Sequence, residues 1–247
     1  MKKRLLIIGA GGFGREVLGW VQHATAAASP WSVRGFLDAN PHALDRLQSA
    51  CPIVGDPETY PPGPDDVFVC AIGDPATRLR LARQIEQRGG RFITLIHPTA
   101  VVWPDCTLGA GTILYPHTAV TTNATLGKFV ALNLHASVSH DATVGDGCML
   151  CSHADVTGNT VLGEGVFLGS HASVLPGTRV GDFAKVGAGS VVLRSVPPRT
   201  TVVGVPAKRL ASVAAASDQK RRQQATQAPD PALDRVGSLR PIELDLP

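Results

Sequence analysis

The stretch from Leu95 to Val196 decides the fold, and in groups of six it reads LIHPTA, VVWPDC, TLGAGT, ILYPHT, AVTTNA, TLGKFV, ALNLHA, SVSHDA, TVGDGC, MLCSHA, DVTGNT, VLGEGV, FLGSHA, SVLPGT, RVGDFA, KVGAGS, VVLRSV. All 17 groups have Ile, Val or Leu at the second position and Ala, Cys, Thr, Ser or Val at the sixth. Residues two apart in a strand point the same way, so the sixth residue of one group and the second of the next face inward together. Gly, Pro, Asn and Asp gather at positions three to five, where the chain must turn.

A second period shows how many groups make one coil. Glycine and histidine each recur in every third group, at Gly109, Gly127, Gly145, Gly163 and Gly181 and at His117, His135, His153 and His171. Three groups therefore form one coil, and the coils stack at the strand spacing of about 4.8 Å. An antiparallel sandwich would instead show irregular turns at intervals of about 8–12 residues. The uninterrupted repeat predicts a parallel β-helix over residues 96–210.

Residues 1–95 have a different pattern, in which short apolar runs alternate with helical periodicity. Four runs are typical of strands, at 5–8, 33–38, 67–72 and 92–96, and residues 78–85 form an amphipathic helix that ends at Gly89 and Gly90. This order predicts a small parallel sheet with helices on its faces. The tail, 211–247, favours a weak helix over 211–227 and then an extended or disordered segment.

Composition and charge exclude several classes of protein. The chain has 247 residues, a net charge of +3 and 17% charged residues. Nucleic-acid-binding proteins usually carry a clustered basic face, and the low, mixed charge of this chain does not indicate one. Its first apolar run, 5–8, is too short for a signal peptide or a membrane span. We therefore expect a cytoplasmic protein that binds neither membrane nor nucleic acid, with its five cysteines as reduced thiols.

The glycine-rich segment GAGGFG, residues 9–14, follows the first strand and precedes a helix. Backbone N–H groups of such a loop approach phosphate closely, and the helix N-terminus favours negative charge. Asp38 ends the second strand, where a ribose or sugar contact is expected. Three interpretations stay open: a single bound nucleotide, NAD, or glycines with a purely structural role. Only about four strands precede the β-helix, which disfavours NAD because the dinucleotide fold has two βαβαβ halves.

His140 is the candidate catalytic residue, because no other group of six carries histidine at its fourth position. A neutral imidazole can take a proton from an attacking amine or hydroxyl. Asp141 can orient the ring and stabilise its cation, if the backbone bends enough for neighbours to meet. The alternative is that His140 is a solvent-exposed histidine at a corner of the β-helix, with no role in catalysis.

The four periodic histidines all occupy the fifth position and should point outward along one edge. Imidazoles stacked one strand apart do not form a tetrahedral metal site, so we expect no metal. Packing between subunits and contact with a substrate both stay open, and His135 is the member most suited to substrate contact. Cys148 and Cys151 imitate a C-x-x-C motif, but their positions in the repeat face different ways, which disfavours zinc or redox use.

These motifs resemble the hexapeptide-repeat acyltransferases and, more closely, the nucleotide-sugar and sialic acid acetyltransferases. The resemblance covers residues 1–210 and is carried by IIGAGGFG (7–14), FLD (36–38), AIG (71–73), SVSHD (137–141) and GVPAKR (204–209). It implies a small Rossmann-like domain over 1–95, a left-handed β-helix over 96–210 and a homotrimer with pockets between subunits.

The resemblance also implies the chemistry and the site. Acetyl-CoA would be the co-substrate and a nucleotide-linked amino sugar the acceptor, with His140 as general base and Asp141 beside it, where the family often has the longer Glu. The residues implied for the nucleotide sugar are Gly11, Gly12, Phe13, Asp38, Asn133 and His135. Those implied for acetyl-CoA are Met149, Ser170 and Ala188, with Lys208 and Arg209 near its phosphates.

Two other functions compete with this hypothesis. A sialic acid-type O-acetyltransferase would use a hydroxyl in place of the amine, and a non-catalytic β-helix would only display a binding surface. The unique His140–Asp141 pair speaks against the second. The residues leave open the choice of nucleotide, sugar and acyl group and the role of the tail.

Overall fold

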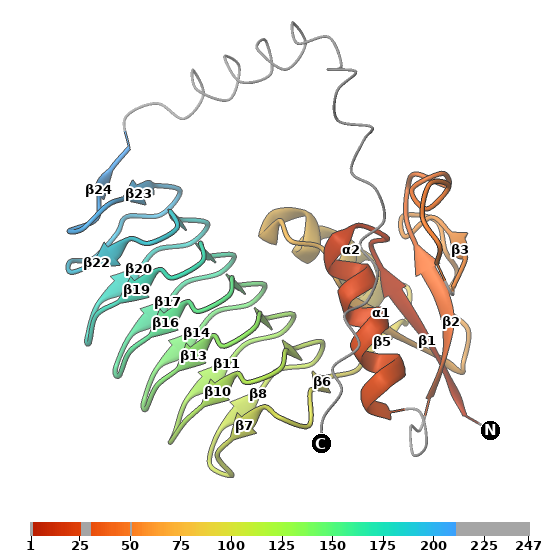
Figure 1. Cartoon of the computed structure of the whole chain (residues 1–247), viewed down its shortest axis with the longest axis horizontal. Helices are drawn as coiled ribbons and strands as arrows, with labels where there is room; N and C mark the ends of the chain where they lie inside the picture. The colour runs from red at the N-terminus through yellow and green to blue at the C-terminus, as the bar shows by residue number, and fades with distance from the viewer. Residues whose placement is uncertain (1, 26–30, 50, 211–247) are drawn as a thin grey trace, which may run out of the picture. The chain divides into compact units, whose positions relative to one another are not determined.

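The computed structural model describes residues 2–25, 31–49 and 51–210 (Figure 1). Residues 1–210 form one compact unit. The helix expected over 211–227 and the extended segment after it lie outside the described residues. None of the described helices combines the length and the apolar character that crossing a membrane requires.

The N-terminal part contains a five-stranded sheet in the order β3-β2-β1-β4-β5, with all neighbours parallel. Its strands are β1 (Lys3–Ile8), β2 (Trp31–Leu37), β3 (Ile53–Gly55), β4 (Asp66–Cys70) and β5 (Arg91–Phe92). The strands expected at 5–8, 33–38 and 67–72 correspond to β1, β2 and β4. The run at 92–96 splits between two sheets, and the short strand β3 was not predicted because so short a run has no measurable period.

Two helices connect these strands, α1 (Gly12–Thr25) and α2 (Pro75–Gln87). Helix α2 begins where the Asp74 side chain accepts the Thr77 N–H, with proline at the first helical position. It ends before Gly89, whose φ of +85° is the left-handed conformation that stops a helix. The expected helix and its glycine stop are both present.

Residues 95–210 form a parallel β-helix whose strands stack in three sheets, which we call faces 1, 2 and 3. Face 1 consists of β6 (Leu95–Ile96), β9 (Ile113–Leu114), β12 (Ala131–Leu132), β15 (Met149–Leu150), β18 (Phe167–Leu168), β21 (Lys185–Val186), β23 (Thr201–Val203) and the antiparallel β24 (Lys208–Arg209). Face 2 consists of β7 (Val101–Val102), β10 (Ala119–Val120), β13 (Ser137–Val138), β16 (Asp155–Val156), β19 (Ser173–Val174) and β22 (Val191–Val192). Face 3 consists of β8 (Thr107–Leu108), β11 (Thr125–Leu126), β14 (Thr143–Val144), β17 (Val161–Leu162) and β20 (Arg179–Val180).

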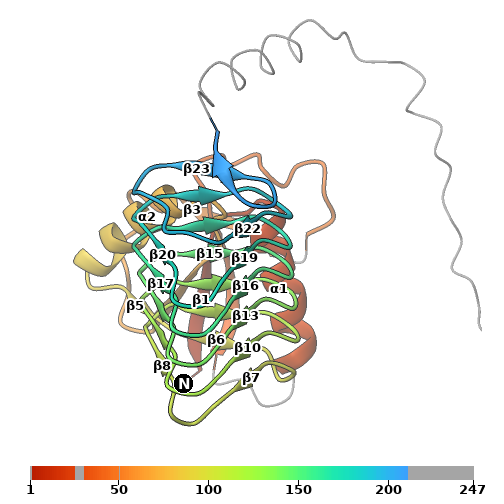
Figure 2. The same cartoon turned by 90° about the vertical axis from the view of Figure 1, so that its left-hand side faces the viewer.

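The coils stack in register, as the repeat predicts. Ala119 pairs with Ser137 and Ser137 with Asp155, each one coil further on, and Figure 2 shows the strands of face 2 one above another. Side chains from the second and sixth positions fill the interior between Leu114 and Val202. The end coil is open, and Ile96 is therefore 45% exposed although it occupies a second position.

The corners share one backbone feature. Every fifth-position residue from Gly111 to Gly189 has a φ between 55° and 76°. Glycine adopts this left-handed conformation freely, and Asn, Asp and His tolerate it better than other residues. The conformational demand of the corner therefore explains which residue types recur there.

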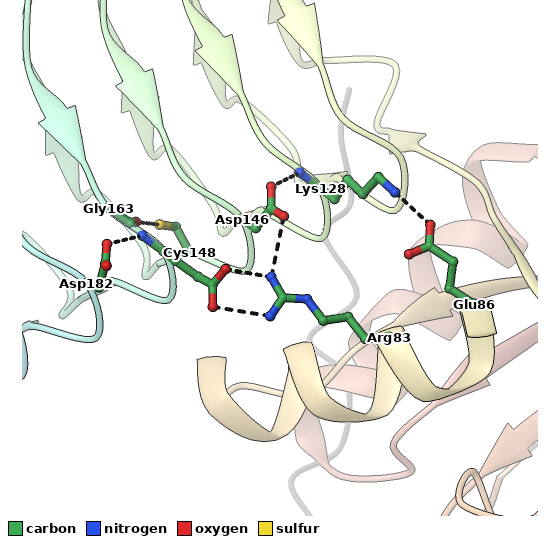
Figure 3. Close-up of polar contacts among 8 residues, drawn as sticks. Arg83, Glu86, Lys128, Asp146, Cys148, Gly163 and Asp182 are labelled. Atoms are coloured by element: carbon green, nitrogen blue, oxygen red, sulfur yellow. Dashed lines mark hydrogen bonds and ion pairs between the residues drawn. The ribbon is translucent and has the colours of Figure 1, made fainter.

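The N-terminal part packs on face 1 and on the corner between faces 3 and 1 (the 3–1 corner). Leu5, Ile7 and Val69 belong to the same buried cluster as Ile113 and Met149. Ion pairs surround this contact, between Arg83 and Glu164 at 2.5 Å and between Lys128 and Glu86 at 2.8 Å (Figure 3). The boundary expected after residue 95 falls inside β6. The chain therefore runs directly from the N-terminal part into the first strand of the β-helix.

Candidate active site

The glycine loop after β1 contains glycines of two kinds. Gly9 has a φ of +98°, and a side chain on Gly14 would overlap the Gly9 carbonyl oxygen, so the fold itself requires both. Gly11 and Gly12 are exposed, and a Cβ on Gly11 would meet no atom within 4 Å. Their backbone is therefore free for a ligand to approach.

The Asp38 carboxylate shapes this loop. Its Oδ2 accepts the Ala10 N–H at 2.8 Å, and its Oδ1 accepts the Asn40 N–H at 2.9 Å. These bonds hold the glycine loop against the end of β2. Each oxygen keeps a second lone pair for a ligand hydroxyl.

A cavity of about 180 Å³ lies at the carboxyl ends of β1, β2 and β4. Ligands of open α/β sheets bind at this edge. Asp38 lines the cavity, whereas Gly11, Gly12 and Phe13 do not. The remaining lining residues are Gly9, Leu37, Ala39, Pro57, Glu58, Ile72, Thr77, Arg80 and Leu81. Sequence reasoning missed the three from α2, although the second strand-to-helix turn at residues 71–74 was a signal for them.

His140 and Asp141 lie at the corner between faces 2 and 3 (the 2–3 corner), between β13 and β14. Nδ1 of His140 is 2.8 Å from Oδ2 of Asp141. The φ of +59° at Asp141 supplies the bend that brings the two neighbours together, and Asn123 donates to the other carboxylate oxygen at 3.2 Å. The hydrogen bond from His140, followed by that from Asn123, lowers the pKa of the Asp141 carboxyl. An ionised Asp141 holds the proton on Nδ1 and leaves Nε2 as an acceptor.

Gly158, one coil further on, makes room for this imidazole. A Cβ at Gly158 would overlap Cε1 and Nε2 of His140, so the ring lies directly over the glycine. The backbone does not need glycine here, because the φ of Gly158 is outside the left-handed region. Within the described chain its N–H donates to no other residue, while the next N–H, of Asn159, donates to the His140 carbonyl at 3.0 Å. Sequence reasoning missed Gly158, although it is the one glycine among the fourth positions of the 2–3 corner.

The periodic histidines form a stacked row, which we call the histidine ladder (His117, His135, His153 and His171). Ring centroids are 5.0, 4.8 and 4.5 Å apart, and the planes differ by 14°, 6° and 5°. All four are exposed at the corner between faces 1 and 2 (the 1–2 corner), as predicted. Desolvation, followed by the neighbours His171 and His135, lowers the pKa of His153. Within residues 2–25, 31–49 and 51–210 there is no cluster of three metal-ligating side chains.

The residues expected at acetyl-CoA do not all lie together. Ser170 and Ala188 occupy the same position of successive coils at the 1–2 corner, beside the histidine ladder. Met149 is 5% exposed, and its Sδ accepts a hydrogen bond from Arg78 at 3.1 Å under the N-terminal part. Its side chain is therefore unavailable to the coenzyme. Lys208 and Arg209 are exposed on β24.

Two further expectations concern Asn133 and the cysteines. Asn133 is half-buried at the 1–2 corner, two residues before His135, and its Oδ1 accepts the Leu134 N–H at 2.7 Å. Cys148 lies in the β-helix interior, where burial raises the pKa of its thiol to about 12. Cys151 packs toward the N-terminal part. The two thiols face different ways, as predicted.

The cavity and the histidine lie on different faces of one chain. The N-terminal part that carries the cavity covers face 1 and the 3–1 corner, whereas His140 lies at the 2–3 corner. Among the described residues, the side chain of His140 has its hydrogen bond with Asp141 and none with the N-terminal part. One chain therefore does not bring the cavity and His140 together.

Comparison with known proteins identifies the family. The "PglD N-terminal domain" family model matches residues 4–85, and "Bacterial transferase hexapeptide (six repeats)" matches residues 159–194. The crystal structure of PerB from Caulobacter crescentus, in complex with CoA and GDP-perosamine, is 33% identical, covers 84% of this chain and 97% of its own, and has a TM-score of 0.74. The chain belongs to the hexapeptide-repeat nucleotide-sugar acetyltransferases. The expected fold, a small α/β domain followed by a β-helix, is confirmed.

Other relatives agree with this assignment. The acetyltransferase domain of PglB from Neisseria gonorrhoeae FA1090 is 29% identical, with a TM-score of 0.73, and the match covers 85% of this chain and 100% of that one. The UDP-N-acetylbacillosamine N-acetyltransferase of Bacillus subtilis (strain 168) is 40% identical over 50 residues. That match spans 20% of this chain and 23% of the relative.

The two kinds of glycine give a first prediction. Gly11→Val should change thermal unfolding little, because a Cβ at this position meets no atom within 4 Å, and should weaken nucleotide-sugar binding by at least about tenfold, or about 1.4 kcal/mol. Calorimetry measures the affinity. The matched control, Gly14→Ala, should lower the unfolding temperature through its overlap with Gly9. Full affinity in Gly11→Val would mean that the ligand does not approach this backbone.

The histidine ladder gives a second prediction, on pH. The pKa of His153 in the folded protein lies below that of an unfolded chain, so the stabilisation is present above the unfolded value of about 6.5 and is lost as the pH falls through the folded value. The unfolding temperature should therefore fall less between pH 7.5 and 5.5 in His153→Asn than in wild type. Asparagine tolerates the left-handed backbone at this position. Identical pH dependence in the two proteins would contradict the prediction.

Proposed function

We propose that this protein transfers the acetyl group of acetyl-CoA to the amine of a nucleotide-linked amino sugar. The observation that carries the proposal is the His140–Asp141 pair, whose free Nε2 lies over Gly158 on a β-helix joined to an α/β sheet with a cavity at its carboxyl edge. The relatives support it: PerB was solved with CoA and GDP-perosamine, and the PglB domain with acetyl coenzyme A. Two further structures of the perosamine enzyme carry replacements of a histidine.

His140, Asp141 and Gly158 each have a separate role in the proposed reaction. Acetyl-CoA supplies an activated thioester. As the sugar amine attacks the thioester carbon, Nε2 of His140 takes the proton from the nitrogen, and Asp141 stabilises the imidazolium that forms. The free N–H of Gly158 stabilises the negative charge that develops on the carbonyl oxygen. The C–N bond forms, the C–S bond breaks, and His140 returns its proton to the departing sulfur, giving an amide and free coenzyme A.

The binding residues follow from the two half-sites. Gly11, Gly12, Phe13 and Asp38 hold the nucleotide sugar in the N-terminal part, and Asn133 and His135 contact the acceptor sugar at the 1–2 corner. Ser170 and Ala188, with the cations Lys208 and Arg209, bind the coenzyme through backbone and phosphate contacts. The side chain of Met149 is left out of this set because it is buried against Arg78.

A homotrimer completes the site. Because the cavity and His140 lie on different faces of one chain, the cavity of one copy must meet the 2–3 corner of its neighbour. The histidine ladder and Asn133 lie at the 1–2 corner, which we propose also contacts the neighbour. We keep the cytoplasm as the expected location.

The acceptor is an amine in this proposal because the named relatives are N-acetyltransferases. The nucleotide and sugar are found by incubating the protein with acetyl-CoA and UDP-, GDP- or dTDP-linked amino sugars and their hydroxyl counterparts. Release of free coenzyme A with an amine acceptor supports the proposal. Turnover of the hydroxyl compounds alone would show the O-acetyltransferase, and no turnover of any compound would favour a non-catalytic protein.

The proposed base gives a third prediction. His140→Ala should lower kcat by roughly 10²–10⁴-fold with little change in KM, because proton removal matters mainly in the transition state. Asp141→Asn should lower kcat less than His140→Ala does. Gly158→Ala should also lower kcat, because the methyl group displaces the imidazole. Steady-state kinetics of coenzyme A release measure all three variants.

The control for the glycine variant is Gly19→Ala, since a Cβ at Gly19 meets no atom within 4 Å. It should keep wild-type kinetics. A His140→Ala enzyme that retains most of its kcat, with acetyl transfer limiting the rate, would remove His140 from the mechanism.

A further inference from the structure

Arg78, in the first turn of α2, is a cation buried without a carboxylate partner. It is 0% exposed, and no ion pair of the described residues includes it. Its donors go to backbone carbonyls and to sulfur: Nε to Ile72 at 2.7 Å, Nη1 to Cys148 at 3.1 Å and Phe129 at 3.3 Å, and Nη2 to the Met149 Sδ at 3.1 Å. A buried charge is costly unless its hydrogen bonds are made, so this position demands an explanation.

The β-helix explains why carbonyls at this corner need a donor. In each coil a fourth-position carbonyl accepts the N–H of the fifth residue one coil further on, as Lys128 accepts from Gly147 at 2.8 Å. The fifth-position carbonyls of Phe129 and Gly147 accept no backbone N–H within the described chain. Helix α2 covers them at the 3–1 corner, and Nη1 of Arg78 lies 3.3 and 3.5 Å from their two oxygens. Arg78 thus supplies the donors that the docking of α2 makes necessary.

The same side chain also contacts the nucleotide half of the site. Its guanidinium lies over the Phe13 ring in the glycine loop, 5.8 Å from the centroid. Ile72, which accepts from Nε, lines the cavity, as do Thr77 and Arg80 on either side of Arg78 in α2. Arg78 therefore contacts the glycine loop through Phe13 and the cavity lining through Ile72.

At its other end Arg78 donates hydrogen bonds to the coil of the same chain that carries His140. Gly147 and Cys148 close the coil that begins at Ala131 and carries Asn133 and His140. One side chain therefore connects the cavity to a coil of its own β-helix, and so fixes the cavity relative to the surface that the neighbouring copy meets. The exposed pair of Lys128 and Glu86 joins the same two parts without touching the cavity lining.

We propose that Arg78 is a positioning residue that holds the nucleotide cavity at a fixed place on the β-helix of its own chain, so that a sugar delivered by its nucleotide reaches the His140 corner of the neighbouring copy. The proposal rests on the function proposed above. It has a specific consequence: Arg78 matters for an acceptor that is held through its nucleotide, and not for the same amino sugar without one. Positioning of this kind is worth a large rate factor, since a misplacement of about 1 Å costs about 100-fold.

The test compares two acceptors, the nucleotide-linked amino sugar and the methyl glycoside of the same sugar. In Arg78→Met we expect kcat/KM for the nucleotide-linked acceptor to fall about 100-fold and that for the glycoside to change less than about threefold. Calorimetry with the free nucleoside diphosphate should show nearly unchanged affinity. Arg78→Lys should lie between wild type and Arg78→Met, because it keeps the charge but loses the forked donors. The matched control, Lys128→Gln, should leave both acceptors unchanged, as exposed ion pairs contribute little.

Three results would overturn the proposal: an equal loss on both acceptors, a loss of nucleoside diphosphate binding, or wild-type kinetics in both Arg78 variants. If Arg78→Met does not fold, the Arg78→Lys comparison decides by the same criteria. Failure of the proposed function is a separate result, because wild-type protein would then acetylate neither acceptor.

Discussion

The left-handed backbone at the fifth position of each group of six is the constraint on which the rest of the structure depends. From Gly111 to Gly189 every such residue has a φ between 55° and 76°, which gives each corner the same bend and lets coils of three groups stack in register. Because the stacking is regular, identical residues at one corner meet face to face, as the histidine ladder does. The same bend turns the Asp141 carboxylate back toward the ring of its neighbour His140.

The 3–1 corner shows how the second half of the site is attached. Its fifth positions hold only glycine and phenylalanine from Gly111 onward, at Gly111, Phe129, Gly147, Gly165 and Phe183. A Cβ at Gly147 would overlap Leu79 of α2, so the missing side chain lets the helix approach the corner closely. The Phe129 ring packs against Phe92 with centroids 4.9 Å apart. This close approach buries the corner carbonyls and makes the Arg78 guanidinium necessary.

The sequence predicts whatever depends on spacing along the chain. The β-helix, its coil length, the outward histidines and the His140–Asp141 pair all follow from position within the repeat. The sequence could in principle have predicted the space over Gly158, since Gly158 lies one coil after His140. Only the structure shows that the His140 ring occupies this space. The burial of Met149, the cavity lining from α2 and the role of Arg78 were not predictable, because they depend on how the α/β part packs on face 1. Asp38 was predicted for a ligand, and the structure shows it also holding the Ala10 N–H.

The central claim is that the active site joins the nucleotide cavity of one copy to the His140 corner of the next. The most direct measurement mixes Gly11→Val, which binds the nucleotide sugar weakly, with His140→Ala by co-refolding them in equal amounts. Acetyl transfer is then assayed at a nucleotide-sugar concentration too low to fill the Gly11→Val cavity. Each mixed trimer then contains one interface with both intact halves, so activity should recover to about a quarter of wild type. Mixing His140→Ala with Gly158→Ala, which damage the same corner, should restore nothing. Activity of the first mixture no higher than that of its separate components would contradict the shared site.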